Sequence, residues 1–150
     1  KHHLTNEIMK FISMCGDFGM SWLIVILITN MIDQTRTMSI DMLIALIAAT
    51  LIGQVTIKSL VRRKRPCHTY PEVQLLITTQ SDLSFPSGHT TSSFACSTVM
   101  MLYNPILGII GYIYAILTAI SRLYLFVHYL SDVVTGVILG ITIGIITYLL

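Results

Sequence analysis

The chain has 150 residues, of which 54% are apolar and only 11% are charged, and its mean hydropathy is +0.78. A soluble domain carries about 25% charged residues, so these values exclude an ordinary soluble protein and predict one membrane-embedded domain, residues 1–150. The net charge of +2 gives no support to a nucleic-acid partner. The three cysteines lack the spacing of a metal site and are expected to be free thiols.

The first half of the chain contains two candidate membrane spans. A spanning helix needs about 20 mostly apolar residues, and the first candidate, residues 18–32, is short. Residues 4–15 before it carry apolar side chains at helical spacing, and we expect them to form a helix in the membrane interface. Alternatively, they lengthen the first span and bury Asp17. The second span covers residues 40–61.

A polar segment, residues 62–84, follows the second span, and long loops of this kind are usually functional. No Asp, Glu, Lys or Arg lies between Asp82 and Arg122, a stretch too long for one crossing. Asn104-Pro105 near its middle marks a turn. The sequence therefore predicts three more spans, residues 87–103, 105–121 and 132–150.

Together these segments predict an all-α, polytopic transmembrane bundle with about five spans and an N-terminal interfacial helix. Five crossings place the polar segment and residues 122–132 on the same side of the membrane as the N-terminus. Gly136, Gly140 and Gly144 lie on one face of the last span, where small residues allow helices to approach closely.

Lys58 and Arg65 are the first candidate pair. Seven residues bring them to nearly the same face of a continuous helix, which should end at Arg65 because Pro66 disfavours helix there. The two cations could then bind one anion. For Lys58, a side chain that merely extends to the interface is an equally good interpretation. An interfacial role is favoured for the neighbouring basic residues, Arg62, Arg63 and Lys64.

Pro86, Ser87, Gly88 and His89 precede an apolar run. Pro and Ser are common at helix starts, and the free N–H groups and dipole of a helix N-terminus bind phosphate. Gly88 would allow an oxyanion to come close, with His89 in the first turn beside it. The alternative is an ordinary helix cap.

The last group is Arg122, His128 and Asp132. His128 and Asp132 are four apart, so a helix would place them on one face, and a carboxylate there makes the other imidazole nitrogen a better nucleophile. A purely structural pair, with an interfacial arginine, is the alternative. Arg122 and His128 converge only if the chain breaks between them, because six residues turn a helix by roughly 240°.

These residues resemble the three motifs of the type 2 phosphatidic acid phosphatase family, K-x6-RP, PSGH and SR-x5-H-x3-D. The chain has all three, in order and with the family's spacing, and they frame residues 58–132, which are half of the chain. The matching residues are Lys58, Arg65-Pro66, Pro86-Ser87-Gly88-His89, Ser121-Arg122, His128 and Asp132.

The resemblance implies a lipid phosphatase that works through a phosphohistidine intermediate. His128 corresponds to the nucleophile, Asp132 to its orienting carboxylate and His89 to the acid that protonates the leaving oxygen. The residues that correspond to the phosphate cradle are Lys58, Arg65, Arg122, Ser87 and Gly88. Phosphoryl transfer depends on charge stabilisation and positioning, which the cations can supply, so we expect no metal and no other cofactor.

The resemblance leaves the lipid open. Similar bacterial proteins act on undecaprenyl diphosphate, which we favour, or on phosphatidylglycerol phosphate or phosphatidic acid. The partners expected are the lipid substrate and membrane lipid, with no obligatory protein partner. Soluble vanadium haloperoxidases share the motifs, but the predicted spans argue against them. An anion-binding or transport protein is the rival from another class.

Two arguments about orientation conflict. Most Lys and Arg residues lie on the N-terminal side of the predicted spans and only Arg36 lies on the other, which by the positive-inside rule places the motif side in the cytoplasm. Relatives that recycle lipid carriers work on the outer face. We expect an integral cell-membrane protein with an extracytoplasmic site, its basic residues retained to attract anionic headgroups.

Overall fold

Helices make up every regular element of the structure, a computed structural model that describes residues 3–78 and 83–150. Within these residues the predicted all-α architecture is confirmed. The helices are α1 (His3–Cys15), α2 (Met20–Asn30), α3 (Arg36–Ala49), α4 (Lys58–Val61), α5 (Pro66–Thr69), α6 (Gly88–Tyr103), α7 (Pro105–Tyr124) and α8 (Leu130–Leu149). Short 3-10 segments, Asp17–Gly19 and Asp33–Thr35, flank α2, and a π-helix, Thr50–Ile57, joins α3 to α4.

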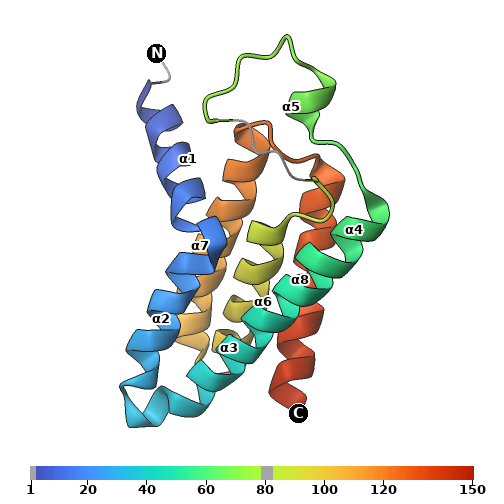
Figure 1. The fold of residues 1–150 in the computed structure, drawn as a ribbon. Helices are drawn as coiled ribbons and strands as arrows, with labels where there is room; N and C mark the ends of the chain where they lie inside the picture. The colour runs from blue at the N-terminus through green and yellow to red at the C-terminus, as the bar shows by residue number, and fades with distance from the viewer. Residues whose placement is uncertain (1–2, 79–82) are drawn as a thin grey trace.

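The chain alternates between the two ends of a helical bundle (Figure 1). α1 and α2 run from the end that holds the N-terminus to the opposite end, and α3 and α4 return. α6 and α7 form a hairpin, and α8 ends where the C-terminus lies, at the end opposite the N-terminus. The loop that carries α5 and the α7–α8 connection therefore lie at the N-terminal end, as the parity of the predicted spans requires.

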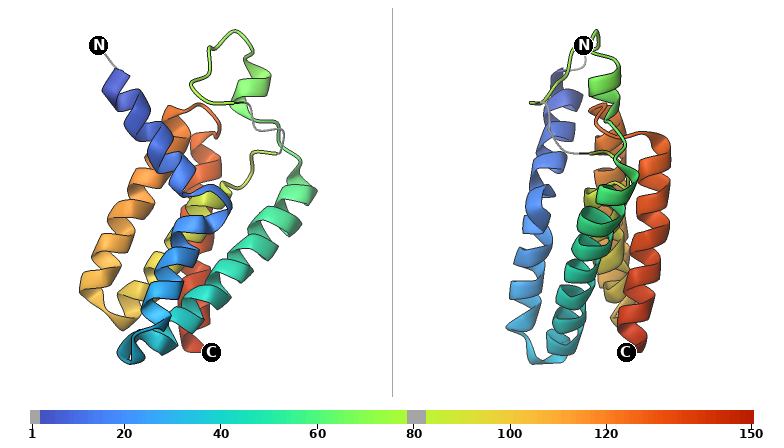
Figure 2. Two further views of the ribbon diagram at one scale, coloured as in Figure 1. Left: turned by 60° about the vertical axis from the view of Figure 1, so that its left-hand side comes forward. Right: turned by 45° about the vertical axis from the view of Figure 1, so that its right-hand side comes forward.

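Helices occupy all five predicted positions, and fewer of them meet the length and apolarity of a membrane span. Three described stretches are long and apolar enough to cross a membrane, Asp33–Thr69, Pro105–Tyr124 and Leu130–Leu149. α1 and α2 are bent by 59° and together would make a fourth, so α1 can be read as half of a bent span or as an interfacial helix. α6 has 16 residues and is buried along most of its length at the centre of the bundle (Figure 2).

The glycine stripe on α8 packs against α6, as predicted. A Cβ added at Gly140 would lie 2.5 Å from the carbonyl oxygen of Thr91, and one at Gly144 would lie 2.6 Å from Cβ of Thr98. No larger residue fits there without moving backbone. Gly136 continues the stripe toward the start of α6, because a Cβ added there would lie 3.0 Å from the carbonyl oxygen of Ser87, beside the chemistry-bearing residues.

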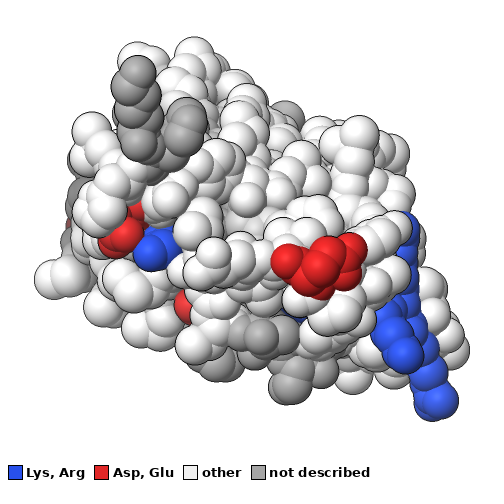
Figure 3. All heavy atoms as spheres, turned by 90° about the horizontal axis from the view of Figure 1, so that it is seen from above, with Lys and Arg blue, Asp and Glu red and all other residues white. Residues whose placement is uncertain are grey.

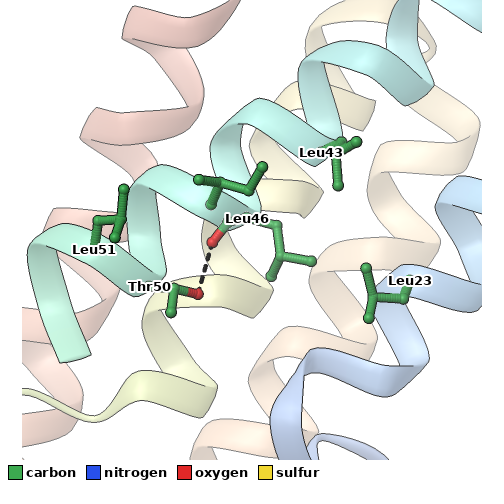
Figure 4. Close-up of a pocket in the computed structure, with 6 residues that line it drawn as sticks. Leu23, Leu43, Leu46, Thr50 and Leu51 are labelled. Atoms are coloured by element: carbon green, nitrogen blue, oxygen red, sulfur yellow. Dashed lines mark hydrogen bonds between the residues drawn. The ribbon is translucent and has the colours of Figure 1, made fainter. Parts of the chain in front are cut away.

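An apolar groove of about 240 Å³ lies between α2 and α3 (Figure 4). Leu23, Leu43, Leu46, Ile47, Thr50 and Leu51 line it. The hydroxyl of Thr50 donates to the carbonyl oxygen of Leu46 at 2.8 Å, so the lining presents little more than hydrocarbon. It offers nothing that would bind a phosphate, and the functional site must be sought elsewhere.

Candidate active site

Side chains from distant parts of the chain meet at the end of the bundle that holds the polar loop. They are the residues singled out from the sequence, Lys58, Arg65, Ser87, Gly88, His89, Arg122, His128 and Asp132. The N–H of Ser87 donates to the carbonyl oxygen of Asp132 at 3.0 Å, which ties the start of α6 to the start of α8. Seen from this end, most of the surface is neither basic nor acidic (Figure 3), because Lys58, Arg65 and Arg122 are buried.

The α7–α8 connection brings His128 back to Arg122. α7 ends at Tyr124, Phe126 adopts a left-handed φ of 59°, and the N–H of Val127 donates to the carbonyl oxygen of Arg122 at 3.3 Å. The predicted break between Arg122 and His128 is confirmed. The prediction that one helix carries both His128 and Asp132 is wrong, because α8 begins at Leu130 and His128 lies in the connection.

The hydrogen bonds of His128 define its tautomer. Nη1 of Arg65 lies 3.1 Å from Nε2 of His128, and a guanidinium can only donate. Nε2 must therefore accept, and in the neutral ring the proton is on Nδ1, which faces Oδ2 of Asp132 at 3.5 Å. That separation is longer than a well-formed hydrogen bond, although such contacts commonly tighten when substrate binds. The lone pair of Nε2 is thus the nucleophilic position.

Burial keeps the His128 ring neutral. The side chain is almost fully buried, and this burial, reinforced by the positive charges of Arg65 and Arg122 and opposed by Asp132, lowers the pKa of His128 to about 3. An imidazole with so low a pKa is uncharged at neutral pH, as a nucleophile must be.

Two groups besides His128 hold the carboxylate of Asp132. Oδ2 accepts from the N–H of Tyr129 at 2.9 Å in the first turn of α8. Nη1 of Arg63 donates to Oδ1 at 2.9 Å and to the Ser131 hydroxyl at 2.7 Å, and the guanidinium lies 3.8 Å from the centre of the Tyr129 ring. Arg63, interpreted from the sequence as a charge that flanks the second span, therefore also holds the carboxylate of Asp132.

Lys58 reaches the start of α6 through Gln54. The Lys58 ammonium donates to Oε1 of Gln54 at 2.8 Å. A Cβ built on Gly88 would lie 1.3 Å from Nε2 of the same Gln54, so the amide lies directly against the Gly88 backbone. Lys58 is only 6% exposed, which excludes the alternative of a lysine that merely extends to the interface.

Arg65 enters the site from a loop. The helix ends at Val61, where Arg62 takes a left-handed φ of 51°, and Arg65 is extended with ψ of 153°. Pro66 indeed keeps Arg65 out of the helix, but the expectation that Lys58 and Arg65 share a continuous helix face is wrong. The extended backbone places Nη1 of Arg65 2.9 Å from the carbonyl oxygen of Val127, next to His128.

The N-terminal segment contributes two further contacts. Nη1 of Arg122 donates to the hydroxyl of Ser13, at the end of α1. Nε2 of His89 lies 2.9 Å from Oδ1 of Asp17, in the 3-10 segment that follows. Arg65 and Arg122 are both close enough to His89 to act on it electrostatically, so the first turn of α6 faces the same cations as His128.

The described residues contain no group of three or more His, Cys, Asp or Glu side chains that could hold a metal ion. Asp132 is surrounded instead by Arg63, the Tyr129 N–H and His128. The absence of a metal in the reaction stays a prediction.

Comparison with known proteins places this arrangement in a family. The model of the PAP2 superfamily matches residues 39–150, which include every residue named from the motifs. The chain belongs to the PAP2 superfamily. The PAP2 match begins within α3, so α1, α2 and the segment that joins them lie outside it.

Three relatives illustrate the PAP2 similarity. The decaprenylphosphoryl-5-phosphoribose phosphatase of Mycobacterium tuberculosis is 41% identical over 60% of this chain, which spans about half (49%) of that relative's length. The undecaprenyl-diphosphatase of Sulfolobus acidocaldarius is 31% identical over 90% of this chain and 65% of its own length. The crystal structure of a transmembrane PAP2-type phosphatidylglycerolphosphate phosphatase from Bacillus subtilis is 27% identical and superposes with a TM-score of 0.79, covering 98% of this chain and 76% of that one.

Four residues that sequence reasoning did not assign to the site contact it in this PAP2 protein: Ser13, Asp17, Gln54 and Arg63. Gln54 and Arg63 lie within the family match, and Ser13 and Asp17 precede it. A carboxylate between two apolar stretches is a visible signal at Asp17. Ser13 and Gln54 are ordinary polar residues in helical sequence, and only the packing of separate helices brings Ser13 to Arg122 and Gln54 to Gly88.

Proposed function

We propose that this PAP2 protein removes a phosphate from a membrane lipid through a phosphohistidine on His128. The observation that carries the proposal is the contact of Arg65 with Nε2 of His128, because it leaves an unprotonated nitrogen beside a cation that can bind phosphate. Asp132 then supports the positive charge that develops on the ring.

In the proposed step, Nε2 of His128 forms a bond to phosphorus while the bond from phosphorus to the leaving oxygen breaks. The electron pair of that bond stays on the leaving oxygen, which takes a proton from His89. Water then attacks phosphorus and gives a proton back to His89, while the bond from phosphorus to Nε2 breaks and its electron pair returns to the imidazole, which releases phosphate. Lys58, Arg65 and Arg122, with the Ser87 hydroxyl and the N–H of Gly88, stabilise the charge on the phosphoryl oxygens. The cations take the place that a metal ion has in other phosphoryl-transfer enzymes.

An anion-binding or transport protein would also place buried cations together. It has no need for a histidine whose nucleophilic nitrogen is defined by Arg65 on one side and Asp132 on the other. The pairing of His128 with Asp132 therefore favours catalysis over binding alone.

For the lipid we propose undecaprenyl diphosphate, in keeping with the name of the Sulfolobus relative. Phosphatidylglycerol phosphate, named for the Bacillus structure, and phosphatidic acid are the alternatives. We expect the detergent-purified protein to release phosphate from undecaprenyl diphosphate fastest of the three, and to do so equally in EDTA. Phosphate release can be followed for each lipid with and without EDTA. Activity lost in EDTA and restored by magnesium would contradict the metal-free mechanism. Faster phosphate release from phosphatidylglycerol phosphate or phosphatidic acid would make that lipid the proposed substrate instead.

His89 should matter only where the leaving group needs a proton. We expect His89→Ala to lower the rate on a lipid phosphate by roughly 10² to 10⁴-fold, the usual contribution of a general acid. An aryl phosphate has a stable leaving group and should lose much less. Parallel assays of both substrates measure the difference, and His128→Ala, which should lose both activities, is the reference. Equal losses on both substrates with His89→Ala would make His89 a binding residue.

We further propose that the site faces the outside of the cell. Labelling of a cysteine can show on which side of the membrane a loop lies. The native Cys67, on α5, is not suitable for such labelling because it is buried. We expect a membrane-impermeant maleimide to label Glu72→Cys, in the exposed loop after α5, in intact cells of a variant whose native cysteines are replaced. Asp33→Cys, with the side chain of Asp33 85% exposed at the opposite end, should be labelled only after permeabilisation. The reverse pattern would restore the orientation that the charge distribution favours.

A further inference from the structure

The segment between α1 and α2 lies against the candidate active site although it precedes the residues that match the PAP2 family. Asp17 and Gly19 belong to its 3-10 turn, and Ser13 lies just before it in the last turn of α1, which ends at Cys15. The last turn of α1 supplies the Ser13 contact to Arg122, and the 3-10 turn supplies the Asp17 contact to His89. Two separate contacts thus fix this part of the chain to two different residues of the site.

The contact with Asp17 defines the tautomer of His89, as the contact with Arg65 does for His128. A carboxylate can only accept a hydrogen bond, so Nε2 of His89, 2.9 Å from Oδ1 of Asp17, carries a proton. Nδ1 is then the ring nitrogen that can take up a second proton and deliver it to a leaving group. The ring is largely buried, whereas Asp17 is 41% exposed and can remain ionised at the edge of the site.

Two glycines allow Asp17 to approach the ring. A Cβ on Gly16 would lie 2.7 Å from Cδ2 of His89, so any side chain there would push the imidazole away. Gly19 has a φ of 69°, a left-handed conformation that glycine adopts without cost, and it turns the chain into α2. A Cβ on Gly19 would also lie 3.3 Å from the side chain of Leu46 on α3, so a larger turn residue would press on it.

We propose that Asp17 is a positioning residue for His89. It holds the ring through Nε2–H and stabilises the positive charge of the doubly protonated imidazole, so that Nδ1 can release its proton to the leaving oxygen. Asp17 neither contacts phosphate nor joins a covalent step in this proposal. The inference rests on the proposed phosphatase function and adds to it a residue from outside the family match.

The test compares Asp17→Asn with the parent protein on a lipid phosphate and on an aryl phosphate. Asparagine keeps the shape of the side chain and removes its charge. We expect kcat on the lipid to fall by about 10- to 100-fold, the range seen when an orienting partner is lost, with little change in KM or in the aryl rate. Glu7→Gln, which changes an exposed carboxylate on α1 that pairs with Lys10, is the matched control and should behave as the parent.

A double variant tests whether Asp17 acts on the reaction through His89. If Asp17 acts through His89, adding Asp17→Asn to His89→Ala should cause no further loss on the lipid. The proposal would be overturned if the losses of the two single variants multiplied in the double variant. It would also be overturned if Asp17→Asn slowed turnover of the aryl phosphate as much as that of the lipid. Faster lipid turnover in Asp17→Asn would overturn it too, because Asp17 would then compete with the leaving group for His89. Each of these results leaves phosphatase activity in the parent protein intact, whereas a parent that turns over neither substrate would overturn the proposed function itself.

Discussion

His128→Ala is expected to abolish lipid phosphate turnover, with a loss of roughly 10⁵-fold or more, as when the nucleophile of a hydrolase is removed. The reason is the position of Nε2, whose lone pair faces Arg65 and is the proposed attacking group. A phosphoenzyme trapped by rapid denaturation should be stable in base and labile in acid, and it should be absent from the variant. Phosphate release and the radiolabel retained on the protein measure the two effects.

The matched control for this substitution is His68→Ala, because His68 is an exposed histidine on α5 at the same end of the molecule. It should keep the parent's rate and phosphoenzyme. His128→Gln provides a second test, since a polar side chain of similar length is less disturbing to the buried Arg65 than alanine. Substantial turnover in either His128 variant, with the protein eluting as a folded species, would remove His128 as the nucleophile.

Asp132→Asn should slow the reaction by roughly 10³ to 10⁴-fold, comparable to the loss when a triad carboxylate becomes an amide. The amide can donate to Nδ1 of His128, which favours the tautomer with the proton on Nε2 and removes the nucleophilic lone pair. Binding of vanadate, a mimic of phosphate, should change little, because Lys58, Arg65 and Arg122 remain. Single-turnover rates and vanadate inhibition constants separate the two expectations.

Asp41→Asn is the matched control for Asp132→Asn. The carboxylate of Asp41 accepts a hydrogen bond from the Tyr103 hydroxyl at 2.7 Å, near the start of α3 and away from the site, and its replacement should leave the rate unchanged. If Asp132→Asn weakened vanadate binding as strongly as it slowed turnover, Asp132 would instead be holding the cradle together through Arg63 and the start of α8.

The places of the helices were predictable because they depend on local sequence. Apolar runs of membrane-spanning length, the Asn104-Pro105 turn and the glycine stripe on α8 each act over a few residues or one helix face. Helix boundaries were less predictable. α4 stops four residues before Arg65, because Arg62 takes a left-handed conformation that sequence pattern does not reveal.

The sequence by itself determined which side chains carry the proposed chemistry and on which side of the bundle they gather. Motif spacing identifies the residue types, and the predicted alternation of helices between the two ends of the bundle places the motifs at the end opposite the C-terminus, where Figure 1 shows the polar loop. The tertiary structure alone decided which hydrogen-bond partners these side chains have. The partners of His89, Arg122 and Asp132 are Asp17, Ser13 and Arg63, each from a distant element. The tautomers and charges of buried side chains depend on contacts between helices. Such contacts produce no repeating pattern in the sequence of any single helix, so the sequence does not reveal them.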